Sequence, residues 1–202
     1  MNALQRKEAH MEQIITIRDA DLTYQARNGE VEALRGVTFS VAEGEFVSIV
    51  GPSGCGKSTL LGVLAGLETL DGGTAALRGS AISGPNRLVG FMPQRDQLFE
   101  WRTIRDNVML GLELRRDRDP VHRRHAEALL ARYGLAEFAD KRPDQLSGGM
   151  RQRCALIRTL ATGPDILLLD EPFSALDYQT RLAVSGDIWR IIRGEGKTAL
   201  LV

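Results

Sequence analysis

The sequence predicts an α/β fold with a mainly parallel central sheet, and three observations lead to that prediction. An apolar run at 46–50 is followed by a glycine-rich loop and by apolar residues at helical spacing. A second apolar run, at 166–169, lies between turn residues and is typical of a parallel strand buried on both faces. Helix, strand, helix and strand then follow one another from 151 to 202. We expect one compact α/β core.

Composition limits what the chain can be. Its 202 residues suffice for one core, or for a core and a subsidiary lobe. Lys and Arg total 26, as do Asp and Glu, and this zero net charge disfavours nucleic acid as an obligatory partner. No apolar stretch approaches the roughly 20 residues of a membrane-spanning helix, and residues 1–12 lack the apolar centre of a signal peptide. We expect an intracellular chain that reaches a membrane only through a partner.

The cysteines and histidines indicate neither a disulfide nor a metal site. Cys55 and Cys154 lie far apart and form no C-x-x-C pair, so we interpret them as reduced thiols. The histidines, His10, His122 and His125, show no ligand spacing with the cysteines, and we interpret all three as surface residues.

The first elements predict an antiparallel β unit. Alternation at 14–17 and 22–24 indicates strand, and Asn28-Gly29 is a strong hairpin signal. The stretches 31–34 and 37–41 are expected to form the returning strands.

After the first helix, short strands are expected at 74–77 and 88–92, the second ending at Pro93-Gln94. From about 101 to 145 the composition turns rich in Arg, Leu, Glu and Asp, which predicts a helical lobe inserted into the core.

Within this lobe, Thr103 and Asp119-Pro120 mark helix starts, and Tyr133-Gly134 marks a stop. The charge run 115–119 is interpreted as a solvated linker between two helices. The core resumes with a glycine pair that opens a helix at 151–161, and Leu176-Asp177 introduces another helix through about 193.

The glycine-rich loop has the context of a phosphate-binding site. Its residues are Gly51, Pro52, Ser53, Gly54, Cys55, Gly56, Lys57, Ser58 and Thr59. The glycines allow backbone N–H groups to converge on a polyphosphate, and the next helix adds free N–H groups and a positive dipole end. Lys57 can reach the β- and γ-phosphates, Ser58 can ligate Mg²⁺, and Thr59 is a weaker candidate for a phosphate contact. A glycine turn with a solvated lysine is the alternative, which the flanking strand and helix disfavour.

Two acidic residues follow the strand at 166–169. Asp170 and Glu171 emerge at its carboxyl end, where open α/β sheets place their ligands. A helix cap followed by a surface acid is the plain alternative for such a pair.

Motifs in fixed order resemble those of the nucleotide-binding subunit of ABC transporters. The Walker A loop is 51–59, the Q-loop glutamine is Gln94, the signature is 146–150, and the Walker B strand is 166–170. The D-loop is 174–177, and the resemblance extends over the chain from about residue 14.

The resemblance implies a P-loop NTPase core, an N-terminal antiparallel β subdomain and an inserted α-helical subdomain. Residues 1–202 then form one domain. Its ATP-binding core with the β subdomain comprises 1–94 and 146–202, and its helical subdomain comprises 95–145 and carries the signature at its end.

The resemblance also implies roles within one subunit. Tyr24 would stack on adenine, which makes ATP the expected nucleotide. Asp170 would hold the Mg²⁺ shell with Ser58 and Gln94, while Glu171 would orient and deprotonate the attacking water. Gln94 would also sense the γ-phosphate and the orientation of the helical lobe together.

Other residues would act between subunits. The ATP of a second ATP-binding subunit, in a head-to-tail dimer, would be met by Ser147, Gly148, Gly149 and the D-loop residue Asp177. Without the resemblance, Ser147, Gly148 and Gly149 would suggest only a serine helix cap followed by a glycine turn. The resemblance further implies integral membrane permease subunits, docked near Phe99 and Trp101, and indirectly a solute-binding protein. Burial in the core is the equal alternative for Trp101.

Details of the motifs resemble the importers of nitrate, sulfonates, taurine and similar small anions. Met150 stands where glutamine is commoner, and the segment 98–103 carries Glu100 in place of a proline. The family's switch histidine follows the strand that here reaches Val202, so we interpret the sequence as truncated before it.

The expected function is ATP hydrolysis that energises import of a small solute, from a peripheral position on the cytoplasmic face of the inner membrane. One alternative is a non-transport ABC-type ATPase that acts mechanically in translation or DNA repair. Another is a regulatory ATP-binding module without catalysis, which Glu171 disfavours.

Overall fold

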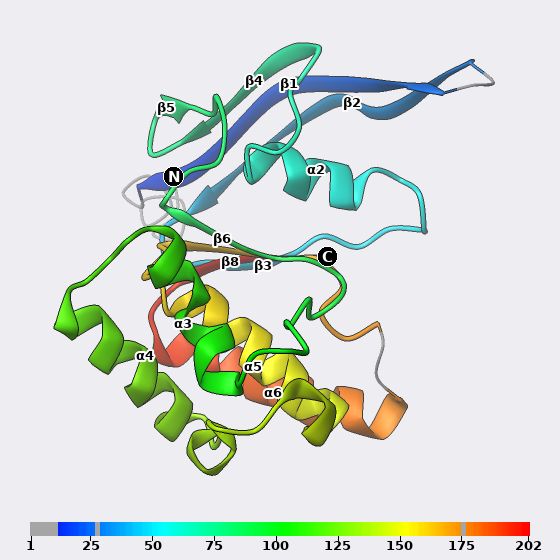
Figure 1. The fold of residues 1–202 in the computed structure, drawn as a ribbon. Helices are drawn as coiled ribbons and strands as arrows, with labels where there is room; N and C mark the ends of the chain where they lie inside the picture. The colour runs from blue at the N-terminus through cyan, green and yellow to red at the C-terminus, as the bar shows by residue number, and fades with distance from the viewer. Residues whose placement is uncertain (1–11, 27–28, 175–176) are drawn as a thin grey trace, which may run out of the picture.

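The computed structural model describes residues 12–26, 29–174 and 177–202, and its elements stack in layers (Figure 1). An antiparallel sheet lies at one end, α2 and a parallel sheet follow, and the remaining helices cover the far face of the parallel sheet. The strands are β1 (Gln13–Ala26), β2 (Gly29–Ala42), β3 (Phe46–Ser48), β4 (Gly72–Leu77), β5 (Ser80–Ala81), β6 (Val89–Met92), β7 (Ile166–Leu169) and β8 (Thr198–Leu201). The helices are α2 (Lys57–Leu64), α3 (Ile104–Leu114), α4 (Pro120–Arg132), α5 (Gly148–Leu160) and α6 (Tyr178–Gly194), with 3₁₀ turns η1 (Ala136–Phe138) and η2 (Pro143–Gln145).

The antiparallel sheet has the order β2-β1-β4-β5, which confirms the antiparallel unit expected at the start of the chain. β1 and β2 are single 14-residue strands, longer than the short pieces expected. Their register shifts on either side of Ala20, so the irregular sequence there bends the ladder without ending it. The hairpin residue Asn28 lies outside the described residues.

The parallel sheet has the order β3-β8-β7-β6, and all its neighbouring strands run parallel. Every residue of β7 is buried, as predicted for a strand covered on both faces. Ile166 and Leu168 join the core on the side of α2, while Leu167 and Leu169 join the core on the side of the helices. The side-chain alternation of a strand therefore divides β7 between two cores.

Helix termini follow the capping signals in the sequence. Thr103 Oγ1 accepts a hydrogen bond from Asp106 N at 3.1 Å, and Asp119 Oδ1 accepts one from Val121 N at 2.8 Å. α4 ends before Gly134, whose φ of +72° suits glycine. α5 begins at Gly148, three residues earlier than expected, because Ser147 caps the glycines into the first turn.

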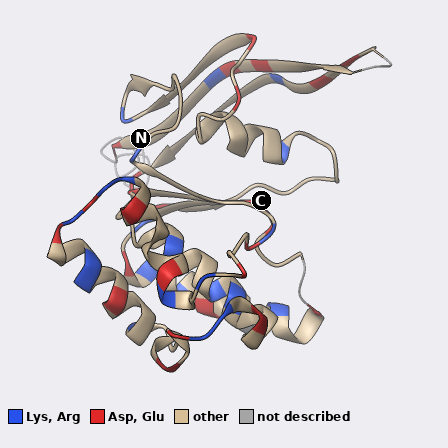
Figure 2. Cartoon of the chain, viewed as in Figure 1, with Lys and Arg blue, Asp and Glu red and all other residues tan. Residues whose placement is uncertain are grey.

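The helices α3 and α4 lie in the segment predicted as the inserted lobe, whose limits at 95–145 stay a prediction. Charged residues of both signs lie along the helices (Figure 2), and most of the linker 115–119 is exposed. His122 and His125 are exposed as expected, and His10 lies outside the described residues. Cys55 and Cys154 are both free thiols. In the described part of the chain, no helix combines the length and apolarity needed to cross a bilayer.

Candidate nucleotide-binding site

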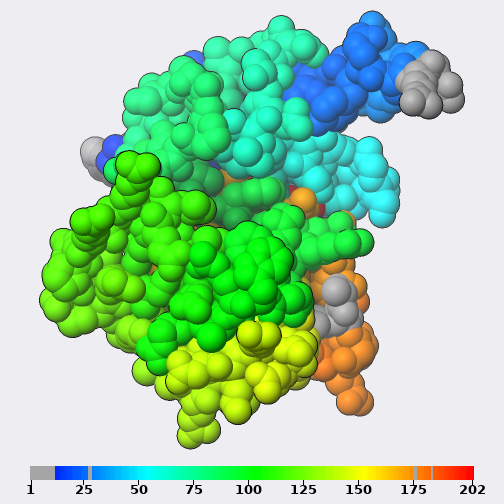
Figure 3. Space-filling model, viewed as in Figure 1, coloured from blue at the N-terminus to red at the C-terminus, as the bar shows by residue number. Residues whose placement is uncertain are grey.

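A cavity of about 250 Å³ opens where β3 gives way to α2. Three parts of the chain meet there: the β1–β2 hairpin, the glycine-rich loop and Glu171, which follows β7. The lining residues are Tyr24, Val31, Ala33, Ser53, Gly54, Gly56, Lys57, Ser58, Thr59 and Glu171. The hairpin projects from the body on the same side as the loop (Figure 3), so the opening lies between them.

A larger cavity, of about 450 Å³, lies between the end of α2 and β4. Its lining holds one charged side chain, that of Glu68, and no lysine or arginine. A polyanion therefore has no counter-charge there, and the smaller cavity beside Lys57 is the better nucleotide site.

Two glycines give the loop its path. Gly54 and Gly56 have φ values of +80° and +91°, a region that residues with a Cβ atom seldom adopt. A Cβ atom on Gly56 would lie 2.1 Å from the carbonyl oxygen of Ala33, so the loop packs directly against β2. Residues 51–55 are exposed, which leaves this stretch of backbone open to a ligand.

The Lys57 ammonium lies over the loop that precedes it. Nζ donates hydrogen bonds to the carbonyl oxygens of Gly51 at 3.1 Å and Pro52 at 2.9 Å, and Cys55 Sγ is 3.8 Å away. These acceptors are neutral, and Lys57 forms no ion pair within the described residues, although Glu171 lines the same cavity. The ammonium is therefore placed for phosphate oxygens, which accept stronger, charge-assisted hydrogen bonds.

Ser58 and Asp170 are in direct contact although 112 residues separate them. Ser58 Oγ donates to Asp170 Oδ1 at 2.8 Å. Asp170 is 9% exposed, and its N–H donates to the Met92 carbonyl at 2.9 Å, which extends the β6–β7 pairing to the site. A hydroxyl and a carboxylate are hard oxygen donors, and Mg²⁺ takes one or two such protein ligands together with substrate phosphates. The donor set fits Mg²⁺.

Glu171 and Gln94 also meet. Gln94 Nε2 donates to Glu171 Oε2 at 2.8 Å, which brings together the residues that follow β6 and β7. Glu171 has a φ of +42°, uncommon for a residue other than glycine. Its N–H donates to the Val202 carbonyl at 3.0 Å, and its own carbonyl accepts from Ser174 N at 3.1 Å. Backbone strain of this kind gathers at functional positions, where the surrounding structure holds it.

The hairpin forms the apolar wall of the cavity. Tyr24 pairs with Val31 across β1 and β2, and both line the cavity together with Ala33. Val31 and Ala33 were not among the residues picked out from the sequence. The signal that could have found them is the hairpin register, because residues 31 and 33 lie two apart on the strand that faces Tyr24.

The signature residues do not line this cavity in the described part of the chain. Ser147 and Gly148 are exposed at the start of α5, and Gly149 is buried, with Val184 Cγ2 close to where its Cβ would lie. Asp177 is exposed and caps α6, accepting from Gln179 N at 3.1 Å and Thr180 N at 3.0 Å. Hydrogen bonds from Thr180 hold the pKa of Asp177 below its usual value. The middle of the D-loop, 175–176, lies outside the described residues.

Comparison with known protein families shows which family the chain belongs to. The family model described as ABC transporter matches residues 34–174. The chain belongs to the ABC transporter family. The family predicted from the motifs is thereby confirmed.

Individual relatives of this ABC family member are ATP-binding proteins. It is 43% identical over 180 residues to the uncharacterized ABC transporter ATP-binding protein YtlC of Bacillus subtilis, covering 89% of this chain and 69% of the relative. It is 41% identical over 189 residues to the taurine import ATP-binding protein TauB of Ruegeria pomeroyi, covering 93% and 70%. It is 48% identical over 171 residues to the aliphatic sulfonates import ATP-binding protein SsuB 2 of Agrobacterium fabrum, covering 85% and 64%.

Solved ABC cassettes have the same fold. The dimeric post-hydrolysis structure of the ATP-binding cassette MJ0796 bound to ADP and Pi superposes with a TM-score of 0.78 at 32% identity. The superposition covers 93% of this chain and 87% of that chain. The predicted α/β fold, with its antiparallel β subdomain and parallel sheet, is confirmed.

Proposed function

We propose that this protein is the ATP-binding, ATP-hydrolysing subunit of an ABC transporter and that it energises import of a small solute through separate membrane subunits. The observation that carries the proposal is the convergence of the two contacts Ser58–Asp170 and Gln94–Glu171 beside the Lys57 ammonium. Relatives named as import ATP-binding proteins support the transport part.

Hydrolysis divides among a few residues. Backbone N–H groups of 51–56 and the start of α2 bind the phosphates, and Lys57 compensates charge on the β- and γ-phosphates. Glu171 takes a proton from the attacking water. The oxygen of that water bonds to the γ-phosphorus while the bond from this phosphorus to ADP breaks. Gln94 holds the Glu171 carboxylate until Mg²⁺ binds. Tyr24, which pairs with Val31 across the hairpin, stacks on the adenine.

Mg²⁺ is proposed as the metal. Ser58 and Asp170 would hold it, with Gln94 as a further oxygen ligand once its side chain leaves Glu171. When bound, the ion neutralises charge that builds on the phosphate oxygens during transfer. Ser58 Oγ can donate its hydrogen to Asp170 and still offer an oxygen lone pair to Mg²⁺, so this hydrogen bond is compatible with the proposed metal site.

A dimer of two ATP-binding subunits would complete the site. Ser147 and Gly148 present a hydroxyl and free N–H groups to solvent at the start of the 13-residue helix α5, outside the cavity of their own subunit. Such a helix start favours an anion. We propose that it meets the triphosphate held by the second subunit, with Asp177 at the same interface.

Replacing Ser147 with Arg tests the dimer. Both proteins carry Glu171→Gln. ATP is expected to shift the one that keeps Ser147 from monomer to dimer. Ser147→Arg should weaken that association by at least about 10-fold, or roughly 1.4 kcal/mol, because its side chain fills the space of the partner's phosphate. Sedimentation velocity with and without ATP measures the shift.

Ser80→Arg is the matched control for this substitution, since Ser80 is exposed on β5. It should leave dimerisation unchanged. Equal ATP-driven dimerisation of the Ser147→Arg and Ser80→Arg proteins would contradict a head-to-tail arrangement.

The membrane partner is proposed to dock at the segment after Gln94. Phe99 and Trp101 stack with ring centroids 4.7 Å apart, and Trp101 is 70% exposed, contrary to the core alternative. Aromatic residues are enriched at interface centres. The names of the relatives support sulfonates, taurine or similar small anions as solutes. We propose that a separate solute-binding protein delivers them. The protein would then lie peripherally on the cytoplasmic face of the membrane.

Trp101→Ala tests the docking site. The wild-type protein, expressed with the integral membrane subunits of its transporter, is expected to co-purify with them from detergent. The substitution should lower recovery of those subunits by about 10-fold or more, as for an interface hot spot. Quantitative mass spectrometry measures the ratio.

Trp189→Ala, on α6, is the control and should recover the membrane subunits at the wild-type ratio. If the wild-type protein binds no membrane subunit, the transport role is wrong and a mechanical ABC ATPase is favoured. Equal recovery with Trp101→Ala would place the docking surface elsewhere.

A further inference from the structure

Arg151, in the first turn of α5, binds two carboxylates of the segment that leaves the Q-loop. Its Nε donates to Asp96 Oδ2 at 2.8 Å. A second guanidinium nitrogen, Nη2, donates both to Asp96 Oδ1 at 3.3 Å and to Glu100 Oε1 at 2.7 Å. The contact to Asp96 is bidentate, the geometry in which an arginine fixes a carboxylate most firmly.

A second arginine of α5 holds the backbone of the same segment. Arg158 donates to the carbonyl oxygens of Gln97 at 2.7 Å and Asp96 at 2.6 Å. Arg158 lies seven positions after Arg151, about two helical turns, so both project from one face of α5. Gln97 has a φ of +47°, so the segment is held in a conformation that its own backbone does not favour.

The Arg151–Asp96 pair is shielded from solvent. The two side chains are 25% and 18% exposed, so water and salt screen this pair less than a surface pair. Its hydrogen bond to Asp96 is the largest cause that raises the pKa of Arg151. Burial raises the pKa of Asp96, but the hydrogen bonds from Arg151 and from Leu98 N outweigh it, and that pKa is lowered overall. Both groups are charged when they meet.

The contacts of Arg151 with Asp96 and Glu100 lie between two proposed functional surfaces. At one end, Arg151 N donates to the Ser147 carbonyl at 2.9 Å, so the arginine belongs to the turn that carries the signature. At the other end, Glu100 lies between the stacked rings of Phe99 and Trp101 in sequence. The contacts of Arg151 with Asp96 and Glu100 therefore link the proposed docking surface to the signature turn.

We propose that Arg151 is a positioning residue that makes the segment 96–101 and the signature turn move as one body. A membrane subunit that displaces Trp101 then displaces Ser147 with it, which brings the signature into or out of reach of the partner's ATP. This inference rests on the proposed function, because it assigns the coupling between that function's two surfaces. Glu100 supplies the second carboxylate that Arg151 binds. It stands at the position where the importers that this chain resembles carry proline.

The test compares Arg151→Met with Arg105→Met in the full-length protein. Arg105 also forms ion pairs within the helical lobe, with Glu127 and Asp140, but touches neither surface. Arg151→Met is expected to raise amide hydrogen exchange of 96–101 by about 10-fold or more, since that segment loses its side-chain anchor. It should lower kcat for ATP hydrolysis by a similar factor, with KM for ATP within about 2-fold of wild type, because the subunit's own phosphate loop is untouched.

A charge-swapped protein, Asp96→Arg with Arg151→Asp, guards against a mere folding defect. It restores an ion pair of reversed direction and should recover at least about half of wild-type kcat, while each single substitution stays low. Arg105→Met should match wild type in both measurements. Loss of kcat that the swap does not rescue would overturn the proposal.

Unchanged exchange of 96–101 in Arg151→Met would also overturn it, whatever the rate of hydrolysis. An increase in KM equal to the loss in kcat would do the same, because it would indicate damage to the subunit's own nucleotide site. If the wild-type protein binds ATP without hydrolysing it, the proposed function fails, and the exchange measurement still decides the role of Arg151.

Discussion

Glu171→Gln is expected to lower kcat for ATP hydrolysis by about 10²- to 10⁴-fold while ATP binding stays intact, the range that loss of a general base produces. The amide keeps the size of the side chain and can still form a hydrogen bond with Gln94, which lies 2.8 Å away. It cannot take a proton from water. Phosphate release measures the rate, and equilibrium titration with a fluorescent ATP analogue measures binding.

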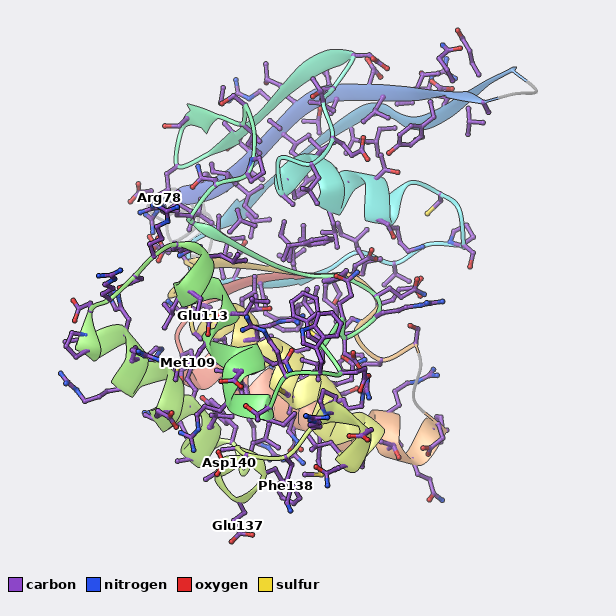
Figure 4. All side chains as sticks on the ribbon, in the orientation of Figure 1. Arg78, Met109, Glu113, Glu137, Phe138 and Asp140 are labelled. Carbon is purple, nitrogen blue, oxygen red and sulfur yellow. The ribbon has the colours of Figure 1, made fainter. Side chains whose placement is uncertain are left out.

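Glu137→Gln is the matched control because this glutamate is exposed on η1 and points away from the body of the molecule (Figure 4). It should leave both quantities unchanged. Hydrolysis by Glu171→Gln within about 3-fold of wild type, well short of a base's usual contribution, would remove Glu171 from the role of general base.

Lys57→Ala is expected to weaken ATP binding by about 100-fold, or roughly 3 kcal/mol, the upper value for a hydrogen bond to a charged group. Lys57 is the cation that lines the nucleotide cavity in the described part of the chain. Removing it takes away this positive charge and leaves the backbone donors and the proposed Mg²⁺ to bind the triphosphate in the subunit's own cavity. Isothermal titration with ATP and Mg²⁺ measures the change in Kd.

Lys141→Ala, at an exposed position between the two 3₁₀ turns, removes the same charge from elsewhere on the surface and should not change Kd. A Kd for Lys57→Ala within about 3-fold of wild type, a difference of roughly 0.7 kcal/mol, would show that the triphosphate binds somewhere else. The cavity near β4, with its single glutamate, would then need to be tested as the nucleotide site.

The parts of this molecule that could be predicted from the sequence are those set by local patterns. Four apolar residues in a row specify β7, and threonine or aspartate before an apolar period specifies the starts of α3, α4 and α6. The phosphate loop is local as well, because its glycines, lysine and helix start are contiguous. The family followed from the order of such local motifs, and the matching family model confirmed it.

The parts that could not be predicted depend on contacts between distant residues. The strand order of the parallel sheet follows from crossovers that no local pattern records. Val31 enters the cavity through the register of a hairpin, and Arg151 meets Asp96 across 55 positions. The positive φ of Glu171 is imposed by its surroundings, since glutamate does not favour it.

The order of the parallel sheet has a consequence for how the molecule folds. β8 lies between β3, which precedes the phosphate loop, and β7, which precedes Asp170. β3 and β7 are therefore joined through a strand that is translated about 150 positions after β3. Pairings of such long sequence separation form slowly. During synthesis, we expect the antiparallel hairpin to assemble early, and the parallel sheet beside the nucleotide cavity to be completed only after residues 198–201 have been made.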